Sequence, residues 1–481
     1  MTPKDSVDGT SAPAQLKREL GFLETIALSI GISAPTAVLA LNGVLPASLI
    51  GKATPLAFAF AAVIVALVAF MYIQFTRAYA SAGSVYSFAG RGWGPRAGFF
   101  GGWALLGAYL SLTIGVLAQV GLFFGGFLDS VGAPNIDWLG IAVAAGLALW
   151  FVLYRDIRLA TRTLLSIEGL SVLGIVVLFV VIYVKLFSGS APSGQDFTLS
   201  PFDPTGLSFS AVAFASVAGF LSFVGFDGAA TLGEESRNPR KTIPKAIITY
   251  VIVMGVFFTF GMFTETIGFG VDAAGVNAFA TSSAPLSDLS NAYVGQWLGE
   301  FILLGASFSA FACAIGLGAA TSRILMALSR DGFLSPRLGH VHPKSGAPAN
   351  AGSAVIVTSL VVLVAMRLGD ASAVNAFFYP ATIGVFLILS AYIVANLAGI
   401  KFFFLGRRLA LWKVSIPVVG LVALFYTFYK NVLPVPAYPY NVFPYVAGGW
   451  LLIGVAIVLL VPGLAERLGQ RLTEEDLAEE V

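Results

Sequence analysis

The chain has 481 residues, of which 57% are hydrophobic and 11% are charged, and its mean hydropathy is +0.88. A soluble domain carries about 25% charged residues, so this composition excludes a soluble enzyme and a disordered chain. A single cysteine, Cys313, excludes a disulfide scaffold, and the net charge of +2 gives no basis for expecting nucleic acid as a partner. We therefore expect an all-α polytopic protein that is embedded in the lipid bilayer.

Twelve apolar stretches are long enough to cross a bilayer, since a crossing helix needs about 20 mostly apolar residues. In chain order they lie at 21–45, 55–79, 97–127, 138–154, 163–187, 207–231, 244–268, 297–328, 349–367, 374–399, 411–430 and 443–463. Residues 1–20 are polar and lack the apolar segment of a signal peptide. We expect 269–296 to hold a short helix outside the membrane and 466–481 to form an acidic tail.

The positive charges of the chain lie on one side of the predicted spans. If both termini are cytoplasmic, 23 of the 27 Lys and Arg residues fall in the tails or the inner loops. The four exceptions are Lys52, Lys185, Arg367 and Lys430. Because cytoplasmic loops carry an excess of Lys and Arg, we expect a multi-pass protein of the cell membrane with both termini in the cytoplasm.

Span one contains Ser33-Ala34-Pro35 near its middle, and Gly31 lies four residues before the proline. A proline inside a helix removes one backbone donor and clashes with a carbonyl one turn back. Within the bilayer, the backbone departs from helical geometry only where it lines a cavity or is buried in protein. The segment is therefore either a simple proline kink or an unwound stretch beside a cavity.

Span six contains Asp227 between Gly225 and Gly228 in an otherwise apolar run. An acid that faces lipid is costly, so Asp227 must face a cavity, a partner or protein backbone. Two interpretations remain open. Asp227 is either a functional acid at a helix break or a packing residue at a helix end near the inner leaflet.

The two candidate breaks occupy the first spans of two successive five-span blocks, 21–187 and 207–399, and 400–465 supplies two extra helices. An odd number of spans inverts the second block relative to the first. Transporters with inverted repeats bind substrate near the midplane, at discontinuous helices of this kind. The N-terminus of a half-helix suits a carboxylate and its C-terminal carbonyls suit an ammonium or a metal cation, so a zwitterionic amino acid matches this arrangement.

Three segments of the chain resemble the amino acid–polyamine–organocation (APC) permeases. They are 225–247, with Gly-Phe-Asp and Glu-Glu-Ser-Arg-Asn-Pro; 329–348, with Ser-Arg-Asp-Gly-Phe-Leu-Ser-Pro; and 82–88, Ala-Gly-Ser-Val-Tyr-Ser-Phe. The resemblance implies a leucine-transporter-type core of 5+5 inverted repeats, in which helices 1 and 6 are discontinuous, followed by two extra helices. It also implies transport of amino acids or amines by alternating access.

The resemblance places the substrate against the unwound parts of spans one and six. The expected binding residues are Gly31, Ile32, Ser33 and Ala34 in span one, and Leu221, Ser222, Phe223, Val224 and Gly225 in span six. This chain departs from many relatives, which have Gly-x-Gly where it has Ser33-Ala34-Pro35. Since Pro35 has no N–H, this segment offers a substrate carboxylate one backbone donor fewer than Gly-x-Gly does.

The resemblance leaves the coupling ion open. Many proton-coupled relatives carry a lysine in span five at the position of Ser171, whereas the acid Glu168 lies one turn earlier in this chain. We expect two acids inside the apolar layer, Asp227 and Glu168. Burial favours the protonated form of a carboxyl, so both are candidates for binding a transported proton. Glu168 could equally form a static salt bridge with Arg162. Either H⁺ or Na⁺ fits as the coupling ion.

Charges of both signs follow span six at the inner face. Two acids, Glu234 and Glu235, are followed by two arginines, Arg237 and Arg240. We expect these four side chains to form ion pairs that close the cytoplasmic side of the transporter. A catalytic role is a weaker interpretation of the same residues.

Other functions fit the sequence less well. We expect no cofactor and no metal site: His340 and His342 form a loop pair without nearby cysteines, and Cys313 is expected to be a packing residue. A membrane-embedded enzyme would need clustered catalytic side chains, and a channel would need rings of polar residues or a filter. An exchanger of the same fold remains an alternative to a symporter.

Overall fold

The structure is a computed structural model. It describes residues 21–79, 84–154, 157–232, 236–330, 332, 334–342, 347–460 and 463, with residues 84, 157–163, 231 and 232 described by their backbone only. This part of the chain contains helices and no strand. Ten helical segments in it are long and apolar enough to cross a membrane, so the expectation of an all-α polytopic membrane protein is confirmed.

The ten segments follow the predicted spans in chain order. They are α1 and α2 (Phe22–Ser33 and Pro35–Leu39), α3 to α4 (Val44–Ile50 and Thr54–Ala78), α6 (Pro95–Ser130), α8 (Ile157–Phe187), α10 (Pro239–Phe269), α13 (Gln296–Arg330), α14 (Ala349–Leu368), α15 (Ala373–Gly399), α16 (Ser415–Val432) and α17 (Phe443–Leu460). Two shorter apolar helices, α7 (Trp138–Tyr154) and α9 (Phe209–Ser222), lie at the predicted fourth and sixth spans.

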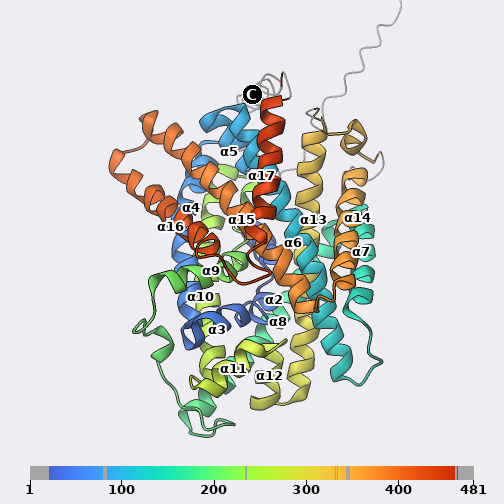
Figure 1. Cartoon of the computed structure of the whole chain (residues 1–481), viewed down its shortest axis with the longest axis vertical. Helices are drawn as coiled ribbons and strands as arrows, with labels where there is room; N and C mark the ends of the chain where they lie inside the picture. Colours follow the sequence, from blue (N-terminus) through green and yellow to red (C-terminus); the bar gives the residue numbers. More distant parts are fainter. Residues whose placement is uncertain are drawn as a thin grey trace, which may run out of the picture.

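Short helices cover the two ends of the bundle. The helix α5 (Ser84–Trp93) lies at the top of the view in Figure 1, and α11 (Ala273–Thr281) and α12 (Pro285–Tyr293) lie at the bottom. Asp272 begins α11 by accepting a hydrogen bond from the amide of Gly275 at 2.9 Å, as expected of a helix N-cap. The segment expected to hold one short helix therefore holds two.

The long helix α6 lies at the centre of the bundle and packs against α7, α13, α15 and α17. In its most apolar segment 83% of the residues are buried, compared with 28% in α16 and 17% in α17. The last two helices are therefore peripheral. One reciprocal contact fastens α17 to α6: the indoles of Trp103 and Trp450 stack at 4.6 Å, and each donates a hydrogen bond to the other residue's carbonyl, at 2.8 and 2.9 Å.

Candidate substrate site at two helix breaks

The first helix break lies within the Ser33-Ala34-Pro35 segment. The helix α1 ends at Ser33, Ala34 adopts the left-handed conformation (φ 48°, ψ 63°), and α2 begins at Pro35. Proline is favoured at the first position of a helix because its φ is preset and its missing N–H has no partner there. The proline therefore starts a new helix after a one-residue interruption instead of kinking a continuous one.

Side chains of two other helices bind the amide groups in the first turn of α2. The N–H of Thr36 donates to Oε1 of Glu168 on α8 at 2.9 Å, and the N–H of Ala37 donates to Oγ of Ser309 on α13 at 3.3 Å. Glu168 is buried, with 4% of its surface exposed. The acid that the sequence offered as a proton site or a salt-bridge partner thus caps α2. The side chain of Arg162 lies outside the described residues.

Ser171 lies one turn after Glu168 and packs against α13. A Cβ atom at Gly305 would collide with the hydroxyl of Ser171, and this hydroxyl donates to the carbonyl of Ile167 at 2.9 Å. The glycine therefore allows α13 to approach α8 closely. The position leaves no open space for a longer side chain.

The second break follows α9, which ends at Ser222. Residues 223–227 form turns, and a short 3₁₀ helix begins at Gly228. Gly225 has φ +126°, a conformation that residues with a Cβ adopt only at a cost. A Cβ atom there would lie 3.0 Å from the carbonyl oxygen of Ser29 and 3.2 Å from the nitrogen of Ser33. The second break therefore rests directly on the end of α1.

A polar contact also joins the two breaks. The amide of Asn42, just after α2, donates a hydrogen bond to the hydroxyl of Ser222 at 2.9 Å, and both side chains are buried. Ser222 in turn donates to the carbonyl of Ala218 at 2.8 Å. Asn42 was not singled out by the sequence, because it lies beyond the proline break and pairs with a residue 180 positions away.

Asp227 is fully buried at the end of the second break. Its Oδ2 accepts a hydrogen bond from the hydroxyl of Tyr109 on α6 at 2.7 Å. The adjacent Phe226 ring lies 5.2 Å from Tyr72 and 5.1 Å from Tyr392. The acid is therefore buried in protein and hydrogen-bonded to α6, and the neighbouring Phe226 packs against aromatic rings of α4 and α15.

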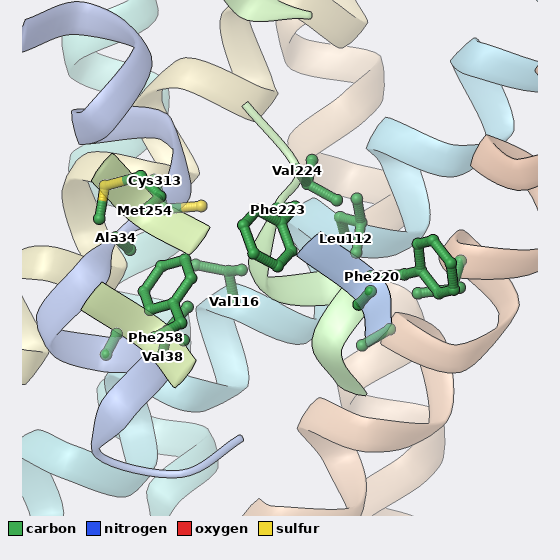
Figure 2. Close-up of a cluster of buried hydrophobic side chains, with 14 of the residues drawn as sticks. Ala34, Val38, Leu112, Val116, Phe220, Phe223, Val224, Met254, Phe258 and Cys313 are labelled. Atoms are coloured by element: carbon green, nitrogen blue, oxygen red, sulfur yellow. The ribbon is translucent and has the colours of Figure 1, made fainter. Parts of the chain in front are cut away.

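Apolar side chains surround the break region. Figure 2 shows Phe223 of the second break beside Phe258 of α10 and Val116 of α6, and the two phenylalanine rings pack edge to face at 5.5 Å. Ala34 and Cys313 belong to the same buried cluster, so Cys313 lies in a packing position. Backbone ends and acids within apolar walls can bind a small molecule that has a charged end and an apolar body.

Residues 20–461 match the protein family described as "Amino acid permease". The chain belongs to this family. It is 27% identical over 367 residues to the branched-chain amino acid permease BcaP of Bacillus subtilis (72% of this chain, 74% of the relative). It is 23% identical over 363 residues to the low-affinity putrescine importer PlaP of Escherichia coli (75% and 77%), and 25% identical over 462 residues to BcaP of Lactococcus lactis (90% and 92%). The resemblance to APC permeases is thereby confirmed.

The permease has a third buried acid in the apolar layer, beside the two expected there. Glu265 lies on α10 within the predicted span 244–268, is fully buried, and neither of its carboxyl oxygens has a hydrogen-bond partner among the described residues. Asp227 and Glu168 are buried as expected, and Glu265 is a further buried acid that the sequence analysis did not name. The signal was present in the sequence, as an acid between two threonines inside an apolar run.

The remaining candidate residues are those of the expected inner gate and the loop histidines. Arg237 and Arg240 are exposed where α10 begins, whereas Glu234 and Glu235 lie outside the described residues. The inner gate of the permease therefore stays a prediction. The ring of His342 packs 4.7 Å from the ring of Tyr154, which is a packing contact in the loop before α14.

Proposed function

We propose that this chain is a secondary transporter that moves amino acids or related amines across the cell membrane by alternating access. The proposal rests chiefly on one observation, the direct contact between two interrupted helices at Gly225 and Ser29. Interrupted helices provide free backbone groups and a pivot within the membrane. Two of the relatives, a branched-chain amino acid permease and a putrescine importer, support the substrate range.

We propose a twelve-span architecture with two inverted repeats. The ten long segments and the two shorter apolar helices add up to the predicted spans. Equivalent spans of the two blocks pack on each other, since α4 contacts α10, α6 contacts α13 and α7 contacts α14. Such pairing is expected when two repeats are related by an axis in the membrane plane. Residues 21–399 then form the core, 400–465 the peripheral helices, and 1–20 and 466–481 the cytoplasmic tails.

In this proposal the substrate binds where the breaks meet. The carbonyl groups at the end of α1 (31–33) and at the second break (222 and 224) face a cationic group, because the C-terminal end of a helix carries a partial negative charge. Asp227 adds a carboxylate beside the second break. We propose that the coupling ion, H⁺ or Na⁺, binds at Asp227 or Glu168.

We propose that a cavity of about 450 Å³ beside α9 serves as an approach to this site. It runs along one face of α9, where Ala211, Phe214 and Val217 line it, and Lys430 lies at its wall. Leu221 occupies the next turn of the same face, four residues after Val217, since residues three and four apart share a helix face. On this helix the lining stops at Val217, one turn before Leu221, which the resemblance places among the binding residues.

Reconstitution tests the proposal. The purified chain in proteoliposomes is given a panel of radiolabelled amino acids and amines, with an inward H⁺ gradient, an inward Na⁺ gradient, or neither. We expect saturable uptake of at least one compound that is faster with one gradient. Uptake that occurs only into vesicles preloaded with substrate, and not into empty ones, identifies an exchanger. Failure to take up any compound, while the reconstituted protein remains monodisperse, would contradict the proposed function.

A further inference from the structure

The first turn of α2 has no backbone N–H left for a substrate carboxylate. The first residue, Pro35, has no N–H. The N–H groups of the next three residues (36–38) bond to Oε1 of Glu168 at 2.9 Å, to Oγ of Ser309 at 3.3 Å and to the carbonyl of Ala34 at 2.9 Å. A helix N-terminus attracts an anion through such donors. In this chain the anion is supplied by the protein itself.

Three acids, Glu168, Asp227 and Glu265, are buried in the described part of the chain, whereas no described lysine, arginine or histidine is buried as a whole residue. The guanidinium nitrogens Nε and Nη2 of Arg91 on α5 are buried, over the ring of Tyr79. A carboxylate taken out of water needs a cation or several donors to offset its lost hydration. A substrate carboxylate at the breaks would find hydroxyl donors such as Thr36 Oγ1 but no backbone N–H in the first turn of α2, and it would be repelled by Glu168 and Asp227.

Both acids at the breaks keep an oxygen available for a cation. Oδ1 of Asp227 and Oε2 of Glu168 are buried and accept no hydrogen bond from any residue that the structure describes. An ammonium group has three donors and no acceptor, and its hydrogen bonds to a carboxylate are of the strong, charge-assisted kind. The free oxygens and the carbonyl ends of α1 and α9 therefore suit an ammonium.

We propose that the substrate of this transporter is an organic amine that has no carboxylate. Its ammonium binds the free oxygens of Glu168 and Asp227, and its hydrocarbon part packs against Phe223 and Phe258. This inference rests on the proposed function and narrows its substrate class. The carboxylate of Glu168 occupies the position at the start of α2 where the carboxylate of an amino acid substrate would bind.

Matched pairs of compounds test the inference. Each pair consists of an amino acid and the amine formed by removing its carboxylate: leucine and 3-methylbutylamine, ornithine and putrescine, lysine and cadaverine. The full chain is reconstituted in proteoliposomes, and the uptake of each radiolabelled compound is measured. The unlabelled other member of the pair is then added as the competitor. We expect every amine to bind more tightly than its amino acid by about tenfold or more, the ratio that one charged hydrogen bond provides.

A charge-removing variant links the preference to the proposed residue. Glu168→Gln keeps an oxygen that accepts from Thr36 but removes the charge, so we expect the amine-to-amino-acid ratio to fall about tenfold. The control is Glu300→Gln on α13, an acid that accepts a hydrogen bond from Gln296 at 2.9 Å and lies away from the breaks; its ratio should equal that of the unaltered chain. Asp227→Asn provides a second test if Glu168→Gln does not fold.

The possible failures are distinct. Equal or tighter binding of the amino acid in all three pairs would overturn the amine assignment while leaving the transport function intact. An unchanged ratio in both Glu168→Gln and Asp227→Asn would overturn the role of the two acids. Uptake of neither member of any pair, or of any other compound in the panel, would overturn the proposed function itself.

Discussion

Gly225→Ala is the sharpest perturbation of the contact between the two breaks. At φ +126° a Cβ atom is strained, at a cost of order 1–3 kcal/mol. The same atom would lie 3.0 Å from the carbonyl oxygen of Ser29, which belongs to the backbone and cannot turn aside. Crowding of this kind costs about 1–3 kcal/mol more. We expect the two effects together to destabilise the protein by about 2–6 kcal/mol.

Two other glycines separate these effects. Gly94 has φ +105°, but a methyl group there would have no atom within 4 Å, so Gly94→Ala introduces the strain without the contact. Gly448 in α17 also has open space and no positive φ, so Gly448→Ala should be neutral or slightly stabilising, because alanine favours a helix over glycine. The thermal midpoint should therefore be lowest for Gly225→Ala, intermediate for Gly94→Ala and unchanged or raised for Gly448→Ala.

The assay is thermal unfolding of the detergent-solubilised protein, followed by binding of the best substrate from the uptake panel. Pushing the breaks apart should also weaken binding in Gly225→Ala, whereas Gly94→Ala should bind normally. If Gly225→Ala and Gly94→Ala unfold at the same temperature and bind substrate equally well, the breaks do not depend on their contact. The candidate site would then have to be placed elsewhere.

Three further changes have defined outcomes. Asp227→Asn still accepts the hydrogen bond of Tyr109 but loses its charge, so uptake of cationic substrates should fall about tenfold and its pH dependence should flatten; an unaltered pH profile and substrate range would make Asp227 purely structural. Glu265→Gln replaces an acid that has no hydrogen-bond partner among the described residues, so the thermal midpoint should stay or rise, and a marked fall would reveal an ionised, stabilised carboxylate. Arg237→Ala should increase labelling of engineered cysteines from the cytoplasmic side if it closes the inner gate, and unchanged labelling would refute that role.

Hydropathy and the length of the apolar stretches were sufficient to predict the class of the fold. A helix that crosses a bilayer forms all its backbone hydrogen bonds internally, so apolar stretches of this length are expected to be helical. The limits of the helices depended on chemistry that hydropathy does not measure. The stretch 244–268 is extended to α10 (Pro239–Phe269), because a proline favours the first helical position even in a polar segment. The stretch 21–45 is shortened, because α2 ends at Leu39 and the chain turns before α3.

The site was predictable only where a residue restricts its own backbone. Pro35 and Gly225 carry their conformational preference in their covalent structure, so both breaks can be located from the amino-acid sequence alone. The hydrogen bonds of Glu168 to Thr36 and of Tyr109 to Asp227 join residues 132 and 118 positions apart. Such long-range pairs cannot be predicted from the residues near each acid in the sequence. They nevertheless determine the hydrogen bonds, and so the role, of each acid.

The Ser-Ala-Pro segment and Glu168 are best understood together. The proline takes away one donor of the second half-helix, and the acid of α8 binds the next donor at 2.9 Å. Either feature alone would leave a partly satisfied helix end: the proline without the acid would leave the amide of Thr36 free, and the acid without that amide would be a buried carboxylate lacking a donor. Together, the proline and Glu168 replace the free N–H groups at the start of α2, which would attract an anion, with a carboxylate oxygen, which attracts a cation. The departure from Gly-x-Gly, which removes one backbone donor for a substrate carboxylate, is therefore consistent with a site that has no need of one.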